Sequence, residues 1–283
     1  MKECSLYKHE GKNIRCFACS QRCIISRNNV GICGVRKNID NKLYLLVYGK
    51  IAAEHVDPVE KKPLYHFLPE TYAYSIGTVG CNFRCGFCQN YDISQLREAA
   101  GAETKPEQII SKAIKNKCKS IAYTYNEPAI FIEFVKDIAI LAHKKGLKNI
   151  LVTNGYFTPE SLNYISNYAD AMNIDLKSFN DKFYLQNCKA RLKPVLDTIK
   201  LAHKKGIHIE ITTLIIPGQN DSDKEFEEIA KFILSVDKNI PWHISRFFPV
   251  YKMKNLEPTP KETLDRAYKI SKKYLNYVYV GNI

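Results

Sequence analysis

Apolar runs alternate with stretches of helical periodicity along the chain from residue 72 to its end. The apolar runs predict strands at 72–79, 119–125, 148–153, 170–176, 207–216, 241–248 and 276–280. The longer periodic stretches predict helices near 106–117 and at 128–145, 159–167, 181–205, 222–236 and 260–274. Regular alternation of this kind indicates a parallel sheet with helical crossovers. The units are too few for a closed eight-fold barrel, so we expect an α/β fold built as a partial, open (β/α)6 barrel rather than a doubly wound sheet.

The first 70 residues show a different pattern. Residues 1–40 are polar and loop-like, and two short apolar stretches at 42–48 and 50–56 predict strands that Gly49 separates. The proline-containing stretch 57–63 ends the second of them, because proline cannot continue a strand ladder. We therefore predict two domains: a small N-terminal cysteine-rich metal-binding module, residues 1–70, and the barrel, residues 71–283.

Cysteines concentrate in the first third of the chain. The module carries the spacing C-x2-C-x3-C-x9-C, formed by Cys16, Cys19, Cys23 and Cys33. Four thiolates in a short segment with little core predict a closed metal site that holds zinc or an iron–sulfur cluster. Buried thiols without a metal are the alternative, and Cys4 has no assigned role.

A second cysteine motif follows the first predicted strand of the barrel. Cys81, Cys85 and Cys88 have the spacing C-x3-C-x2-C. A [4Fe–4S] cluster takes one thiolate per iron, so three cysteines leave one iron free. An open coordination position is typical of a reactive metal centre, as it is for catalytic zinc.

Polar residues also follow the other predicted barrel strands. In parallel α/β folds, functional groups gather on the loops at the carboxyl ends of the strands. We expect one shared site lined by the cysteine loop and by Asn126, Glu127, Asn154, Asp175, Lys177, the Pro217–Gly218 turn and Ser245. His243 joins them if it points inward with Ser245, and a core position is as compatible with the sequence.

Composition and charge add two expectations. The chain has 283 residues and a formal net charge of +13, which favours an acidic electron-donor protein or RNA as partner, or else simply reflects solvated basic faces. It begins without a secretory signal pattern and has no apolar run of membrane-spanning length, so we expect a cytoplasmic protein with no membrane association.

The motifs resemble those of radical S-adenosylmethionine (SAM) enzymes. Within that superfamily the chain resembles the pyruvate formate-lyase activating enzymes, and above all the AmmeMemoRadiSam system family. The segments that carry this resemblance are Asp57–Phe67, Ser75–Phe83, Phe87–Gln95, Tyr123–Pro128, Asn173–Lys177 and the N-terminal cysteine set.

The resemblance implies roles for individual residues. Cys81, Cys85 and Cys88 would hold a [4Fe–4S] cluster whose free iron binds SAM. Glu127, beside Asn126 and Pro128, would accept hydrogen bonds from the SAM ammonium group, although a helix N-terminal carboxylate is the alternative. The further SAM contacts implied are Asp175, Lys177, Asn154 with Thr153, and, near the adenine, Thr213 and the Pro217–Gly218 turn. Val152 stands where the activating enzymes have an aspartate.

The resemblance also implies an activity. It is reductive cleavage of SAM to a 5′-deoxyadenosyl radical that abstracts hydrogen from a substrate, such as a glycine of a protein. A flavodoxin or ferredoxin would donate the electron, and Memo-like or AMMECR-type proteins are the implied associates. Two alternatives stay open at this point: a radical SAM enzyme that modifies RNA, and a non-catalytic iron–sulfur electron carrier.

Overall fold

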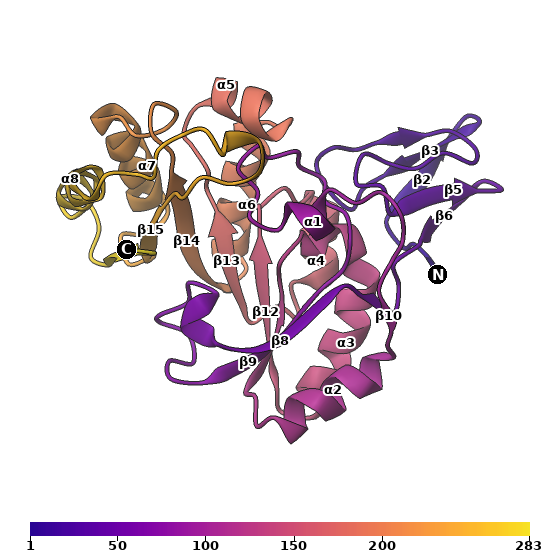
Figure 1. Cartoon of the computed structure of the whole chain (residues 1–283). Coiled ribbons are helices and arrows are strands. Elements are labelled where there is room, and N and C mark those ends of the chain that lie inside the picture. The colour runs from indigo at the N-terminus through magenta and orange to yellow at the C-terminus, as the bar shows by residue number, and fades with distance from the viewer.

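An eight-stranded sheet organises the computed structural model, which describes all 283 residues (Figure 1). Its strand order is β16-β15-β14-β13-β12-β11-β9-β8, so neighbours in sequence are neighbours in the sheet. The strands are β8 (Ala53–Pro58), β9 (Tyr72–Gly77), β11 (Ser120–Tyr123), β12 (Lys148–Thr153), β13 (Ala171–Asp175), β14 (His208–Ile215), β15 (Trp242–Arg246) and β16 (Val278–Gly281). All pairs from β9 to β16 are parallel, and β8 pairs antiparallel with β9. The two edge strands do not pair with each other, which confirms the predicted partial α/β barrel.

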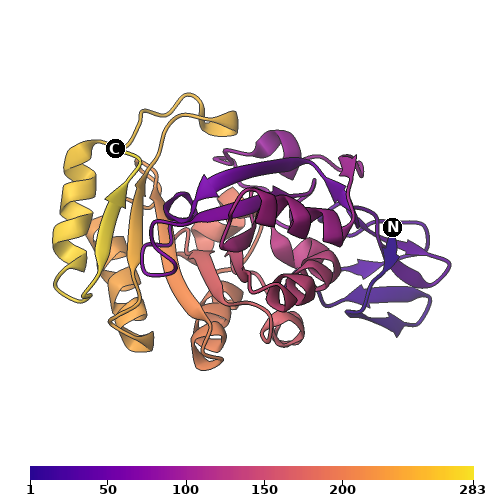
Figure 2. The same cartoon turned by 90° about the horizontal axis from the view of Figure 1, so that it is seen from below.

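Amphipathic helices cover the outer face of this sheet (Figures 1 and 2). They are α2 (Pro106–Lys115), α3 (Ile132–Lys144), α4 (Pro159–Ile165), α6 (Leu192–Lys204), α7 (Asp223–Val236) and α8 (Lys261–Ser271). In α3 the buried residues Phe134, Val135, Ile138 and Ala142 recur at helical spacing and face the core. Proline occupies the first turn of α2 and α4, where its missing N–H costs no hydrogen bond.

The prediction of a single helix over residues 181–205 is wrong. The structure splits it into α5 (Asp181–Phe183), the π-helical turn η3 (Tyr184–Cys188) and α6. Lys189 ends the first part with a left-handed backbone, φ 56°. Pro194 then falls in the first turn of α6, the helical position that tolerates proline best. The short helices α1 (Tyr91–Ser94), η1 (Val59–Lys61), η2 (Pro128–Phe131) and η4 (Tyr251–Met253) lie in loops.

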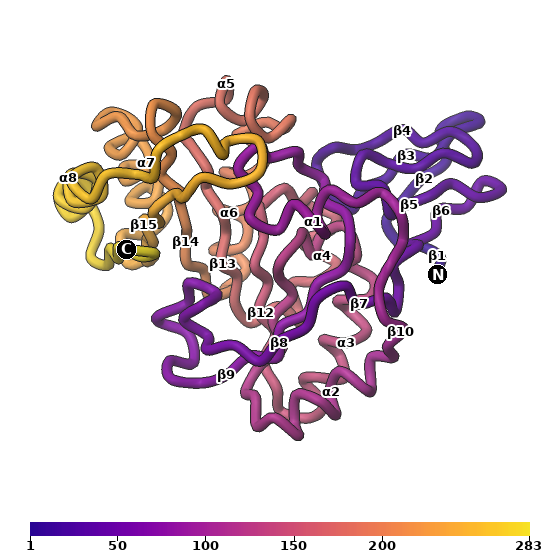
Figure 3. Tube along the Cα trace, viewed as in Figure 1, coloured from indigo at the N-terminus to yellow at the C-terminus, as the bar shows by residue number.

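The first 51 residues form short antiparallel strands, which corrects the loop-like interpretation of residues 1–40. The strands are β1 (Lys2–Glu3), β2 (Tyr7–Glu10), β3 (Asn13–Cys16), β4 (Ile24–Ile25), β5 (Arg36–Ile39), β6 (Lys42–Leu45) and β7 (Lys50–Ile51), and β7 pairs with β10 (Ala102–Glu103). β2-β3-β4 and β1-β6-β5 are two three-stranded sheets at the edge of the molecule (Figure 3). Strands of two to four residues carry too little alternation to stand out in a sequence. β8 lies before residue 70 in the sequence but pairs with β9 of the large sheet. The domain boundary at residue 70 stays a prediction.

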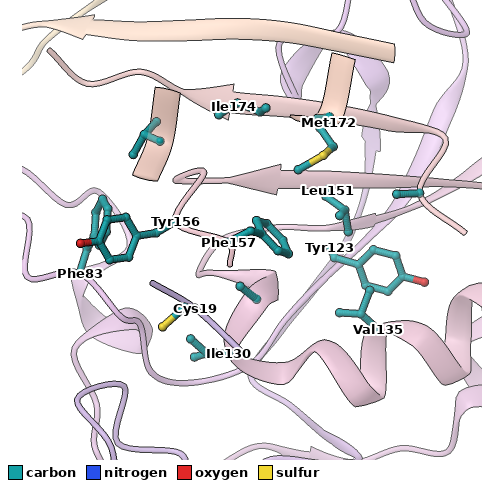
Figure 4. Packing of buried hydrophobic residues seen from close by; sticks show 14 of the residues in the cluster. Cys19, Phe83, Tyr123, Ile130, Val135, Leu151, Tyr156, Phe157, Met172 and Ile174 are labelled. Carbon is teal, nitrogen blue, oxygen red and sulfur yellow. The ribbon is translucent and has the colours of Figure 1, made fainter. Parts of the chain in front are cut away.

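Buried polar and apolar contacts join this N-terminal region to the barrel. The guanidinium of Arg36 forms an ion pair with Glu133 of α3 and donates from Nε to the Ile130 carbonyl oxygen at 2.8 Å. Both side chains are at most 2% exposed, so losing either partner would leave an unpaired buried charge. Cys19 lies in the same apolar core as Ile130, Phe83 and Phe157 (Figure 4).

The segment between β8 and β9 crosses the amino ends of the barrel strands (Figure 2). The Pro63 carbonyl oxygen accepts a hydrogen bond from the Asn173 side chain, and the backbone N–H groups of Tyr65 and His66 donate to Glu210. This segment therefore covers the amino-terminal end of the barrel and leaves the carboxyl ends of the strands as the site face. None of the helices has the length and apolar character needed to span a membrane.

Candidate functional site

The cysteine loop follows β9, and its backbone at Gly80 lies very close to the backbone of Cys33. Gly80 has φ +88°, and a Cβ atom there would lie 2.6 Å from the Cys33 carbonyl oxygen. Only glycine meets both demands. The Asn126 side chain bonds to the Thr78 hydroxyl at 2.9 Å and to the Gly80 carbonyl oxygen at 3.0 Å. The structure thus places Asn126 as a clamp on the segment that leads into Cys81.

The three cysteines of the loop lie at the carboxyl end of the sheet. Burial raises the pKa of the Cys81 and Cys88 thiols, and contact with Cys188 together with burial raises that of Cys85. Thiols in this environment become thiolates only when a cation compensates the charge. No group of three or more His, Cys, Asp or Glu side chains is arranged around a single ion. Three cysteines at the spacing C-x3-C-x2-C suit a [4Fe–4S] cluster, because each thiolate binds a different iron and one iron stays open.

A cavity of about 550 Å³ opens beside these cysteines. Its volume lies in the usual range for small-molecule sites. The predicted Pro217–Gly218 turn does not line this cavity, but the structure brings to it eight of the residues predicted for SAM and the cluster: Cys81, Cys85, Cys88, Asn126, Glu127, Asn154, Asp175 and Lys177. Their roles toward a cofactor stay predictions, but their convergence follows from the parallel sheet, whose strand ends meet on one face.

Glu127 is buried at this mouth and already has several partners. Its carboxylate accepts hydrogen bonds from the backbone N–H of Ala129 at 3.0 Å, that of Asn154 at 2.8 Å and the Thr153 hydroxyl at 2.8 Å. Burial raises the pKa of Glu127 to about 7, although these donors favour the charged form. The residue therefore caps η2, the structural alternative foreseen from the sequence, and it also lines the cavity.

Asp175 and Lys177 form an ion pair that also lines the cavity, with 2.8 Å between the Lys177 Nζ and Asp175 Oδ2 atoms. The Lys177 and Asp175 side chains are 14% and 35% exposed, so the pair is partly shielded from solvent. Burial alone would lower the pKa of Lys177, but Asp175 and the Cys85 thiol outweigh it and hold that pKa well above its usual value. The ammonium group thus stays charged beside the cysteine loop.

Asn154 connects the third barrel strand to the cysteine loop. Its Nδ2 atom donates to the Asn82 side-chain oxygen at 2.8 Å and lies 3.9 Å from the Cys81 sulfur. Its side-chain oxygen accepts the Tyr156 N–H and closes a local turn. Asn154 therefore positions the first cysteine as well as lining the cavity.

The far wall of the cavity is polar. His243 and Ser245 point inward and line it together with Asn173 and Thr212. The His243 Nε2 atom lies 2.6 Å from Glu210, which also contacts His208. Burial opposes ionisation of Glu210, but these histidines and two backbone N–H groups lower its pKa to about 2. Thr213 is a correction: it is fully buried, donates to the Leu176 carbonyl oxygen and does not line the cavity.

Two groups beside the site were not found from the sequence. Asp57 accepts hydrogen bonds from Lys62 at 2.7 Å and from the Tyr125 hydroxyl at 2.8 Å, which ties β8 to the loop after β11. The Ser94 hydroxyl lies 3.1 Å from the Cys88 sulfur. Asp57 and Lys62 stand in a segment that resembles the activating enzymes, and this resemblance was their only sequence signal.

The N-terminal cysteines surround a separate hollow. Cys16, Cys19, Cys23 and Cys33 line it, together with Arg36 and Asn82. Cys4 is buried but does not line the hollow, and Cys118 is buried apart from both cysteine sets. The structure gathers the four cysteines that the spacing predicted, while the identity of the metal stays open between zinc and iron–sulfur.

The fold and the loop together define a class of enzyme. A partial barrel with C-x3-C-x2-C after its first strand, opening on a cavity with a buried carboxylate and a charged lysine, has the donors that a [4Fe–4S] cluster and SAM need. Residues 75–233 match the family model described as the Radical SAM superfamily. The chain belongs to this superfamily and is a radical SAM enzyme related to pyruvate formate-lyase activating enzymes.

Individual relatives agree with this assignment. An uncharacterized protein of Methanocaldococcus jannaschii is 43% identical across the whole of this chain and 86% of its own length. The pyruvate formate-lyase 1-activating enzyme of Escherichia coli K12 is 24% identical over 69% of this chain and 86% of that protein. A radical SAM methyltransferase from Sphaerobacter thermophilus has the same fold, with a TM-score of 0.61 and 15% identity over 76% of this chain and 67% of that one.

Proposed function

We propose that this protein is an activating enzyme that abstracts hydrogen from a glycine of a partner protein. The observation that carries the proposal is the similarity to a pyruvate formate-lyase activating enzyme over 69% of the chain, with the cysteine loop and the Asp-Leu-Lys strand end on one cavity. We further propose membership of the AmmeMemoRadiSam system family, with a Memo-like or AMMECR-type protein as associate.

The residues divide into holding and orienting roles in this proposal. Cys81, Cys85 and Cys88 hold the [4Fe–4S] cluster, which with SAM supplies a carbon-centred radical through one-electron reduction. Glu127 accepts the SAM ammonium group, and Lys177 neutralises the SAM carboxylate. Asn126 and Asn154 keep the cysteine loop in place from two neighbouring strand ends. His243 and Ser245 face the substrate from the far wall.

Burial of these groups protects the chemistry. Glu127 and Asn154 are 1% and 6% exposed, and the segment before β9 covers the amino end of the barrel. A reactive radical formed in the cavity is therefore screened from water that would enter through the amino end of the barrel. The +13 charge is complementary to an acidic flavodoxin or ferredoxin as the electron donor.

The test is an anaerobic assay of the reconstituted protein with SAM and dithionite. We expect 5′-deoxyadenosine, its loss in Cys85→Ala and its retention in Cys118→Ala, a matched change of a buried cysteine outside both sets. A candidate partner labelled with deuterated glycine should transfer deuterium to the 5′-deoxyadenosine and acquire a glycyl-radical signal. Deuterium transfer from labelled RNA instead would replace this function with RNA modification, and absence of any SAM cleavage would leave only the electron-carrier alternative.

A further inference from the structure

Exposed lysines gather at the amino-terminal end of the barrel, on the face opposite the cysteine loop. The helices of the barrel end there, and each is followed by a turn that leads into the next strand. Eleven exposed lysines stand at the helix ends, in these turns or at the strand starts, and we call them the lysine rim: Lys115, Lys117, Lys119, Lys144, Lys145, Lys148, Lys204, Lys205, Lys238, Lys272 and Lys273. The same turns contain only two acidic residues, Asp170 and Asp237.

Ten of the eleven rim lysines have no carboxylate partner. Lys148 alone forms an ion pair, with Asp170 at 2.8 Å. On the flank of α6, by contrast, Lys193 pairs with Asp197 one turn further along the helix. Like charges that are not neutralised repel one another and oppose the compact state. The rim therefore carries a positive charge that the protein itself leaves uncompensated.

The helix dipole explains only part of this pattern. Lys144 and Lys204 are the last residues of α3 and α6, where a positive charge stabilises the carboxyl end of a helix. Lys117 and Lys119 lie beyond the last turn of α2, and Lys148 is already the first residue of β12. The influence of the dipole falls off within the last turn of the helix. The lysines outside the helices therefore need another reason.

The loops of the cavity face mix both signs of charge. Between residues 78 and 107, three basic side chains stand among four acidic ones: Arg84, Arg97, Lys105, Asp92, Glu98, Glu103 and Glu107. The loop and helix start at 217–225 carry three acidic residues and one lysine. A face of mixed charge gives little net attraction for a polyanion. The unmixed charge of the rim thus lies at the far end of the barrel from the cavity.

The residue types on the rim fit phosphates and bases. Lysine binds phosphate as a point charge, whereas protein–protein interfaces are depleted of lysine and enriched in arginine. The rim turns contain no arginine. Tyr72 opens β9 and Tyr277 precedes β16, so both lie at this end, and they are 52% and 40% exposed. Exposed aromatic rings on a basic surface stack with unpaired bases, which RNA presents in its single-stranded loops and ends.

We propose that the lysine rim is a docking surface for single-stranded RNA, which it binds through the phosphates without reading the base sequence. The bound RNA is not the substrate of the radical, because the cysteine loop and the cavity lie at the carboxyl ends of the strands. The rim tethers the enzyme to RNA and leaves the cavity free for its substrate. This inference does not rest on the proposed glycine chemistry.

The first test is binding of a fluorescent oligouridylate of about 16 nucleotides to the full chain, measured by fluorescence anisotropy. We expect a dissociation constant of about 10 μM near physiological salt, and a slope of log K against log salt of about −4, as for roughly six neutralised phosphates. Absence of binding at low salt overturns the proposal. Polyglutamate that binds as tightly would indicate an acidic protein instead. Binding only to vesicles of phosphatidylserine and phosphatidylcholine would indicate a membrane, and preference for oligothymidylate would indicate DNA.

The second test locates the surface with two variants of equal charge. One removes four rim charges and keeps residues of similar helix propensity: Lys144→Gln/Lys145→Gln/Lys204→Gln/Lys205→Gln. We expect it to bind the oligouridylate at least about tenfold more weakly, with a slope that is smaller by about 2 to 3. The matched control removes four exposed lysines from the cavity face: Lys182→Gln/Lys252→Gln/Lys254→Gln/Lys261→Gln. It should change the affinity less than about threefold, because salt screens distant charges. An equal loss in both variants would show that only net charge matters and overturns the rim.

The third test uses the unaltered protein, so it decides even if the rim variant does not fold. An oligouridylate that contains 4-thiouridine is crosslinked by light, and the attached peptides are identified by mass spectrometry. We expect peptides that contain Tyr72 or Tyr277. Crosslinks confined to the cysteine loop or to the strand end at Ser245 would overturn the proposal and make RNA a candidate substrate.

Discussion

The side-chain amide of Asn126 donates to the carbonyl oxygen of Gly80 at 3.0 Å and so joins the loop after β11 to the residue before Cys81. A further bond from the same amide reaches the Thr78 hydroxyl, and the Asn126 side-chain oxygen accepts the Thr78 N–H at 3.3 Å. The sequence predicted a cofactor contact for Asn126. The structure shows that its polar atoms are engaged with the cysteine loop itself.

Replacing Asn126 with alanine should loosen this loop. Because partly buried backbone groups lose their partner, we expect the free energy of unfolding to fall by about 1–3 kcal/mol. Urea denaturation measures that change, and iron retention after gel filtration should fall with it. Asn163→Ala, at an exposed helix position, is the matched control and should change stability by less than about 0.5 kcal/mol. Unchanged stability and iron retention in Asn126→Ala would show that the clamp is not needed.

Glu127 has two roles that one substitution separates. Glu127→Gln keeps an oxygen that can cap η2 but removes the charge that would meet the SAM ammonium group. A hydrogen bond to a charged group contributes about 1.5–3 kcal/mol, so SAM affinity should fall roughly tenfold to a hundredfold. Equilibrium dialysis of the cluster-loaded enzyme measures this affinity, with the exposed Glu262→Gln as control. If Glu127→Gln lowered the stability of the protein but left its SAM affinity unchanged, Glu127 would act only as the N-terminal cap of η2.

Glu210 should make the fold sensitive to acid. Its folded-state pKa of about 2 lies below the ordinary value of 4.5, since two histidines and two backbone N–H groups favour the carboxylate over the opposing effect of burial. A depressed pKa contributes stability that is present above pH 4.5 and is lost as the pH falls toward 2. The shift corresponds to about 3 kcal/mol.

Thermal unfolding between pH 6 and pH 2 tests this expectation. Glu210→Gln should be less stable at pH 6 and should lose less stability on acidification than the unaltered protein. His208 is half-buried at the outer end of the network, so His208→Gln offers a milder comparison that keeps the His243 contact. Parallel pH curves for Glu210→Gln and the unaltered protein would contradict the assignment.

The sequence predicted the barrel because its strands are buried on both faces. β9, β11 and β13 are therefore mostly apolar and buried, which makes them stand out against the amphipathic helices between them. The N-terminal strands are two to four residues long and are held by backbone ladders whose partners lie up to 53 residues away. Composition and periodicity do not indicate which of these distant segments pair with each other.

The candidate site was predictable for a different reason. The cysteine spacing and the order of the strand ends are sufficient to predict Cys81, Glu127 and Asp175 on one face, where the structure has them. The place of Asp57 beside the site was not predictable from periodicity. Its hydrogen bond with Tyr125 spans 68 residues and depends on the antiparallel pairing of β8 with β9. The adjacency of Cys33 and Gly80 likewise emerges only when the turn that carries Cys33 packs on the cysteine loop.

The segment between β8 and β9 also determines how the barrel is joined at its open side. His66 contacts the Tyr279 hydroxyl on β16 at 2.6 Å, and Tyr65 packs against the same ring, with 4.8 Å between ring centroids. The two edges of the sheet are thus bridged by aromatic side chains, whereas every other junction in the sheet is a backbone ladder. A seam of this kind contains no backbone ladder, so parting it would leave every backbone hydrogen bond of the eight-stranded sheet intact.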